Sequence, residues 1–191
     1  MYSVDEKDRV VELTSIPAAD SGSPEVALFA TEHRLVLVYS VPGLEVGQIG
    51  PSGRTLLPED IPPGYDPLAL VEFVRPRAHL FGPPNDEAFH GHPLALRGLR
   101  PYGSYVIEES SWIRSLERMN RVHPRHRPES YRDLRHYVVA FHDKTFECVA
   151  AGVDGRVHEH GAPELARTLR QLSRISEVTN REDPTGVRGH R

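Results

Sequence analysis

The residues of this chain that could do chemistry begin with a loop rich in proline and glycine, residues 82–99. Its polar members are two acids, an amide and two histidines: Asn85, Asp86, Glu87, His90 and His92. Polar groups on a rigid loop are what a binding site needs. We therefore expect the first three to bind a ligand. The structural alternative is that Asn85 and Asp86 cap a turn and that the histidines lie on the surface.

A second group lies in a strand-like segment, residues 135–160, where valine and aromatic residues are frequent. If Phe141 pairs with Phe146, His142 and Glu147 share one face of a hairpin. The pair Asp154-Gly155 favours a further tight turn, which would place two more histidines, His158 and His160, on the same face. The opposite face is expected to be core: Tyr137, Val139, Phe141, Phe146 and Cys148.

This face could hold a divalent metal ion or a general acid and base, because carboxylates and imidazoles serve both purposes. His142 and Glu147 are therefore the catalytic candidates. His142 and His160 would lie more than about 10 Å apart across three strands, so they cannot share one ion. The metal candidates are His90, His92, Glu147 and His160, and the alternative is that all four are solvated or hydrogen-bonded.

The segment 114–136 is basic, with seven arginines against three acids, a local charge of +4. Because the chain carries −4 in total, the remainder carries −8. Guanidinium groups bind phosphates and carboxylates in this way, and Arg121 and Arg125 are the ligand-binding candidates. The alternative is a solvated basic face.

Several enzyme classes lose their support for lack of motifs. The sequence contains no Gly-x-Ser-x-Gly elbow, phosphate-binding P-loop, dinucleotide fingerprint or His-Glu-x-x-His. Its single cysteine, Cys148, excludes an internal disulfide and a Cys-x-x-Cys pair. We expect Cys148 to be buried and inert.

Composition is that of a globular domain. With 191 residues, 38% of them apolar, the chain can bury one core. A net charge of −4 makes nucleic acid an unlikely partner and leaves an anionic small molecule or a protein. No apolar run is long enough for a membrane span, and the first residues are acidic where a signal peptide is basic, so we expect a cytoplasmic protein.

The elements that must position these residues are mainly antiparallel strands. We expect a hairpin over residues 25–41, strands over 9–16, 68–75, 78–81 and 102–108, and a three-stranded meander over 135–160. Ser110 or Ser111 can cap a short mid-chain helix. Pro163 begins a second, amphipathic helix whose apolar stripe is Leu165, Leu169, Leu172, Ile175 and Val178.

The sequence thus predicts one α+β domain over residues 1–179, with an antiparallel sheet that is either open or partly closed into a barrel. A long proline-rich loop covers 76–101, and 180–191 form a flexible tail. The predicted function is the binding of a ligand or partner by the 82–99 loop and the basic 114–136 segment. The alternative is a small metal-dependent or acid–base enzyme.

Overall fold

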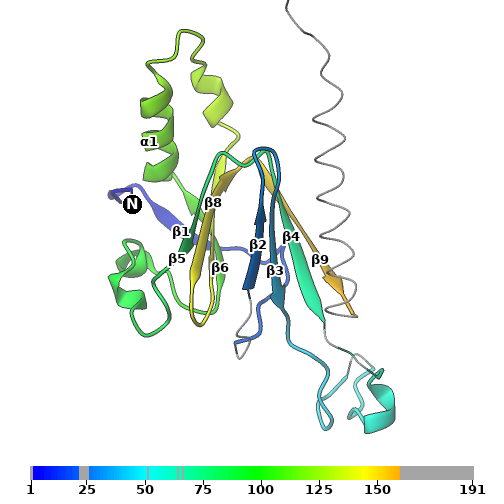
Figure 1. Ribbon diagram of the computed structural model, residues 1–191. Helices are drawn as coiled ribbons and strands as arrows, with labels where there is room; N and C mark the ends of the chain where they lie inside the picture. Colours follow the sequence, from blue (N-terminus) through cyan, green and yellow to red (C-terminus); the bar gives the residue numbers. More distant parts are fainter. Residues whose placement is uncertain (1, 22–25, 51, 64, 66, 160–191) are drawn as a thin grey trace, which may run out of the picture.

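The computed structural model describes residues 2–21, 26–50, 52–63, 65 and 67–159. Within these ranges the chain forms two antiparallel sheets and one α-helix, α1 (Ser111–Asn120) (Figure 1). The five-stranded sheet has the order β1-β6-β7-β8-β5, with β1 (Arg9–Glu12), β6 (Ser104–Glu108), β7 (Arg135–Ala140), β8 (Thr145–Ala150) and β5 (Ala78–Gly82). The four-stranded sheet has the order β2-β3-β4-β9, with β2 (Val26–Ala30), β3 (Leu35–Ser40), β4 (Leu68–Val74) and β9 (Gly152–His158). The antiparallel α+β prediction is confirmed, but two open sheets replace the partly closed barrel.

The main core lies between the two sheets. Alternate side chains of β3 and β4 meet those of β7 and β8, and the rings of Phe73 and Phe146 have centroids 5.1 Å apart. The five residues expected on the core face of the 135–150 hairpin are all buried there. Cys148 is among them, and burial raises the pKa of its thiol, as expected of an inert cysteine.

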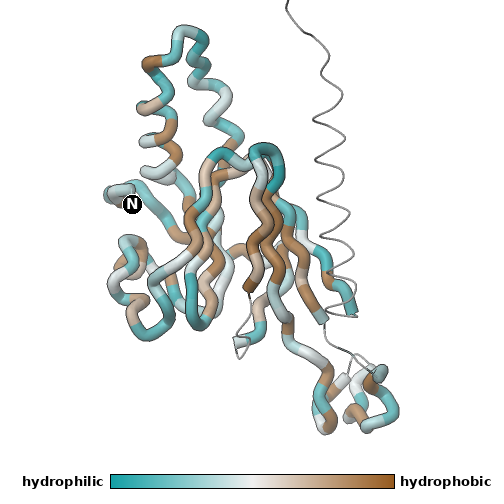
Figure 2. Tube along the Cα trace, viewed as in Figure 1, coloured by the Kyte–Doolittle hydropathy of each residue, from teal (hydrophilic) through white to brown (hydrophobic). Residues whose placement is uncertain are grey.

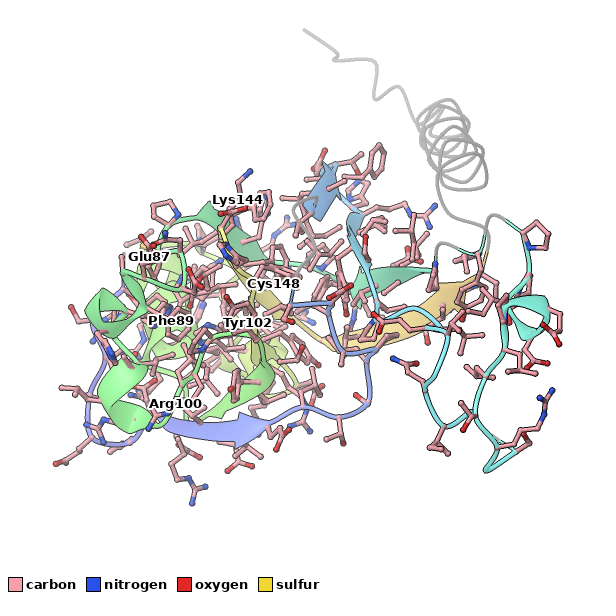
Figure 3. All side chains as sticks on the ribbon, turned by 90° about the horizontal axis from the view of Figure 1, so that it is seen from below. Glu87, Phe89, Arg100, Tyr102, Lys144 and Cys148 are labelled. Atoms are coloured by element: carbon pink, nitrogen blue, oxygen red, sulfur yellow. The ribbon has the colours of Figure 1, made fainter. Side chains whose placement is uncertain are left out.

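The other face of the five-stranded sheet is covered by residues 82–101, by the N-terminal residues and by α1 (Figure 1). We call residues 82–101 the covering segment. Phe89, Leu94 and Leu99 are buried against Ile107 and Val138. The segment therefore has a core of its own, although its prolines suggested only a loop. Its backbone continues from the end of β5 and forms two short 3-10 helices, η2 (Phe89–Gly91) and η3 (Ala95–Arg97). Figure 3 shows Glu87 and Phe89 on this covering segment.

The mid-chain helix begins where its capping residues predict. Ser110 Oγ accepts a hydrogen bond from Ile113 N, and the buried Asp8 carboxylate accepts one from Ser111 N at 2.7 Å. Each bond satisfies a backbone donor that the first turn leaves free. Trp112 then packs with Leu134 of the 121–134 connection, which contains a third short helix, η4 (Pro128–Tyr131). A fourth, η1 (Pro58–Asp60), lies in the 42–67 connection.

The expected meander is wrong in its third strand. After β8 the chain crosses to the other sheet, where β9 pairs with β4 along its whole length, and Asp154-Gly155 lies inside β9. Gly155 is needed for packing, because a Cβ there would lie 2.8 Å from Pro17 Cδ. A glycine required by a close approach thus looks, in sequence, like the glycine of a turn.

The register of the β7–β8 hairpin also differs from expectation. Val139, not Phe141, lies opposite Phe146, and Phe141 N donates to Lys144 O across a tighter turn. The predicted pairing was displaced by two residues on one strand. Because side chains alternate with a period of two, that displacement leaves every residue on its predicted face.

The expected hairpin over 25–41 is confirmed by the pairing of β2 with β3, closed by the Thr31 N to Arg34 O hydrogen bond. The expected C-terminal helix, the tail 180–191 and His160 lie outside the described residues. Within the described part of the chain, α1 is too short and too polar to cross a membrane.

Replacing Gly155 by alanine should destabilise the protein by about 1–3 kcal/mol, since the new methyl group must displace Pro17 and Ile16. Urea unfolding would measure this. The matched control is Gly152→Ala in the same strand, where the nearest atoms to an added Cβ are at 3.7 Å. Equal losses in the two variants would contradict the close approach at Gly155.

Candidate functional site

A carboxylate buried under the covering segment, that of Glu147, is the centre of a polar network. Glu147 lies in the middle of β8 on the sheet face away from the main core and is 3% exposed. Its Oε2 accepts hydrogen bonds from Tyr2 Oη at 2.5 Å and from His136 Nε2 at 2.9 Å. Its Oε1 lies 3.4 Å from His92 Nε2. Three distant parts of the chain therefore meet at one carboxylate.

The two histidines are held by their second ring nitrogens. Leu94 N donates to His92 Nδ1 at 3.1 Å, so the Nε2 of His92 carries the hydrogen that faces Glu147. His136 Nδ1 lies 3.0 Å from Ser110 Oγ, the cap of α1. The His136 ring is also enclosed edge-on by the rings of Tyr2 and Trp112, with centroids at 5.2 and 5.0 Å.

The network keeps Glu147 ionised. Burial by itself raises the pKa of this carboxyl, but the hydrogen bonds from His136, His92 and Tyr2 outweigh burial and lower the pKa to about 2. Burial and the neighbouring charge of Glu147 raise the pKa of Tyr2, which stays a hydrogen-bond donor. A buried anion with three donors is stable only while all three remain in place.

Ser110, His136 and Glu147 are the residue types of a hydrolytic triad, and they are hydrogen-bonded in that order. In a triad, however, the histidine must also reach the leaving group. His136 is fully buried and lines neither of the two hollows described below. Ser110 is itself only 3% exposed, and its Oγ also accepts a hydrogen bond from Ile113 N as the cap of α1. We interpret the chain of bonds as structural: it fastens α1 and the covering segment to the sheet.

The other catalytic candidate, His142, lies apart from this network. It occupies the turn after β7, where its Nδ1 is 3.1 Å from Asp143 Oδ1 and its Nε2 is 3.9 Å from Asp86 Oδ2. The Asp143 hydrogen bond and the Asp86 charge raise the pKa of His142. The structure therefore joins Glu147 to His92 and His136, and His142 to the acids around it.

At the tip of the loop, the polar residues shape the turn, and one of them, Asp86, attaches the loop to neighbouring segments. Asn85 Oδ1 accepts from Ala88 N at 3.1 Å, the arrangement of a capped turn. Asp86 accepts from the Tyr102 hydroxyl, which lowers the pKa of its carboxyl, and its backbone N donates to His142 O at 2.8 Å. Glu87 is exposed.

The histidines expected to bind a metal ion do not lie together. His92 is buried beside Glu147, whereas His90 is exposed on η2. With Nδ1 accepting from Leu94 and the Nε2 hydrogen facing Glu147, His92 has no free lone pair for a metal ion. No three His, Cys, Asp or Glu side chains are grouped as metal ligands among the residues that the structure describes.

The basic segment forms a hollow of about 260 Å³ with the turn between β4 and β5. All the side chains around it are basic or polar: Arg77, Asn120, His123, Arg125, His126, Arg127, Ser130 and Tyr131. We call this the basic hollow. Arg77 reaches it from a turn whose backbone N donates to Val149 O at 2.7 Å, next to the strand that carries Glu147.

One residue of the lining, His126, has a buried polar atom without a hydrogen-bond partner among the described residues. Its Nε2 lies 2.9 Å from Glu117 Oε1, while its Nδ1 is buried and makes no hydrogen bond within the described residues. A buried nitrogen of this kind calls for a water or a ligand. Arg121 is not part of the lining, because it pairs with Glu117 at 2.8 Å and, with His126, lowers the pKa of that carboxyl.

A second hollow, of about 370 Å³, lies between α1, β6 and β7 and is lined by four arginines and two glutamates. Three of those arginines are already paired: Arg9 with Glu108 at 3.0 Å, Arg114 with Asp5 at 2.5 Å and Arg132 with Glu129 at 4.0 Å. The second hollow is larger, but its positive charge is mostly neutralised. The basic hollow therefore keeps more unpaired positive charge than the second hollow does.

Arg125, Glu147 and His92 were among the candidates predicted from the sequence, whereas Tyr2, Ser110 and Arg77 were not predicted as members of these sites. Tyr2 and Arg77 lie far along the chain from their partners, and nothing in their local sequence marks them. Ser110 was identified only as a helix cap. The chain has no significant match to a protein-family model, a curated protein or a solved structure. Its function must therefore be inferred from the geometry of these sites.

Replacing Glu147 by glutamine should cost roughly 3–5 kcal/mol of unfolding free energy, because the donors of Tyr2, His136 and His92 lose the charge that they surround. Chemical denaturation would measure the loss. The control is Glu87→Gln, an exposed carboxyl on the covering segment, which should change stability by less than about 0.5 kcal/mol.

Acid should remove the same contribution. Since the folded pKa of Glu147 is about 2 and its ordinary value 4.5, the unfolded chain binds the extra proton between these values, and stability falls as the pH falls. By pH 3 the loss from this group should be about 2 kcal/mol relative to pH 6. Denaturation at both pH values should show a smaller loss in Glu147→Gln. A parallel decline in both proteins would contradict an ionised Glu147.

Proposed function

We propose that this protein binds an anionic ligand, with the anionic group held in the basic hollow. The observation that carries the proposal is the charge of the lining. Arg77, Arg125 and Arg127 surround one hollow, no acid lines it, and none of the three forms an ion pair within the described residues. Like charges gathered in this way repel one another unless a counter-anion lies between them.

The type of cation supports the same ligand class. Guanidinium groups form paired, charge-assisted hydrogen bonds to phosphate and carboxylate oxygens. Here they approach from two separate segments, the β4–β5 turn and the connection after α1. Donors from several directions suit the tetrahedral oxygens of a phosphate better than a planar carboxylate.

The size of the hollow limits what enters it. A volume of about 260 Å³ is just below the range of about 300–1,000 Å³ that holds whole drug-sized ligands. The basic hollow therefore accommodates a small anion or the anionic end of a larger molecule. A long nucleic acid is disfavoured, because outside the 114–136 segment the chain carries a charge of −8.

Of the two segments expected to form the recognition surface, the basic one carries this proposal. Arg125 lines the hollow, while Arg121 acts through Glu117, which positions His126. In the 82–99 loop, Asn85 caps a turn within the loop, and Asp86 is bonded to Tyr102 and to the turn after β7. Glu87 is left as an exposed acid on the covering segment.

Calorimetric titration with inorganic phosphate, and with a phosphate monoester such as glycerol 3-phosphate, tests the proposal. Arg125→Ala and Arg77→Ala should each weaken binding by about tenfold or more, as expected for a charge-assisted hydrogen bond of about 1.5–3 kcal/mol. Added salt should weaken binding further.

The matched control is Arg118→Ala, which removes an exposed arginine of α1 that does not line the hollow. It should bind the probe like the parent protein. Equal losses in Arg118→Ala and Arg125→Ala would mean non-specific attraction to the basic segment. Absence of binding of both probes to the parent protein would overturn the proposal.

A further inference from the structure

The strand β3 is apolar on both of its faces. It begins Leu35-Val36-Leu37-Val38-Tyr39, and Figure 2 shows hydrophobic colour along this strand. Leu35, Leu37 and Tyr39 point into the main core, so Val36 and Val38 point to the opposite face of the four-stranded sheet. A continuous apolar run is typical of a strand that is buried on both faces.

The side chains on that opposite face are shielded from solvent. Val36 is 0% exposed, Val38 3% and Leu70 7%. Their apolar neighbours among the described residues, Phe29 and Leu68, both belong to strands of the same sheet. We call this cluster the outer apolar face. Strand neighbours flank a side chain but do not cover it from above, so another part of the protein must lie on this face.

The outer face of the five-stranded sheet is covered by other segments of the same chain. Its outer side chains, such as Val138 and Val149, are buried by the covering segment and by α1. For the four-stranded sheet, the described chain ends at residue 159, directly after β9, which pairs with β4. Residues 160–191 follow from that point. Since no apolar side chain from outside this sheet packs on the cluster among the described residues, we look for its cover in residues 160–191 or in a second molecule.

The sequence of that remaining segment fits the outer apolar face. Leu165, Leu169, Leu172, Ile175 and Val178 form one stripe at helical spacing, with Arg167, Arg170 and Arg174 outside it. A helix over 163–178 would be about 24 Å long, enough to cross four strands spaced about 4.8 Å apart. The four residues between β9 and Pro163 suffice for such a strand-to-helix link. Shielding of the face within a single chain argues for this segment over a second copy.

We infer that residues 163–178 dock through their leucine stripe on the outer apolar face, so that the four-stranded sheet, like the other, is covered on both sides. This inference is independent of the anion site. It also explains why the face can be so apolar: an uncovered patch of this kind would favour association between chains.

Thiol labelling of the full chain tests the docking. In Val38→Cys, the new thiol should react with a maleimide at least tenfold more slowly than in Val157→Cys, where the parent side chain is 48% exposed. Adding Leu169→Asp and Leu172→Asp should remove that protection. Adding Arg167→Ala and Arg170→Ala instead, at positions outside the leucine stripe, should leave the protection of the thiol unchanged.

The buried Cys148 reports on folding in the same samples, because it becomes reactive only when the main core opens. Its labelling should stay slow in the Leu169→Asp, Leu172→Asp variant without an introduced cysteine. Rapid labelling of Val38→Cys in the otherwise unchanged chain would overturn the inference. Protection that survives the two aspartates, or that disappears on dilution, would also overturn it and would identify a second copy as the cover.

Discussion

The ionised carboxylate of Glu147 is the point on which one side of this structure depends. A buried charge is tolerated only if donors replace the water that it loses, and here the donors come from Tyr2, His136 and His92. Each belongs to a different part of the chain: the N-terminal residues, β7 and the covering segment. Removing any one of these donors leaves the carboxylate less well solvated and so weakens the attachment of the other two segments. The positions of the three segments therefore depend on one another through this carboxylate.

The same network is connected to the basic hollow in two ways. His136 contacts Ser110, the cap of α1, and α1 leads into the arginines of the 121–134 connection. On the other side, the backbone of Arg77 is bonded to β8, two residues from Glu147. Both walls of the basic hollow are thus attached to the strands that hold the carboxylate. A site made of flexible arginines gains in affinity when its backbone is fixed beforehand.

The charges of the molecule are separated into two kinds of environment. Glu147 is buried and fully surrounded by donors, so it is unsuited to act on a ligand. The arginines of the basic hollow differ from Glu147, because no acidic side chain lines the hollow to neutralise their charge. The first arrangement stabilises the fold, and the second is what a binding site for anions requires. The Glu117–Arg121 pair lies between these extremes, since it neutralises one arginine and orients His126.

The sequence by itself determined the elements whose signals are local. The β2–β3 hairpin, the cap of α1 at Ser110 and the core face of the 135–150 strands all follow from turn residues, capping chemistry and alternation with a period of two. Alternation also explains why a displaced register still placed Cys148 and Phe146 correctly. Tertiary structure alone decided that β9 joins β4, because the glycine that suggested a turn at 155 is instead required by the approach of Pro17. It likewise brought Tyr2 to Glu147 and Arg77 to Arg125, since contacts between residues far apart in the chain leave no trace in the spacing of either.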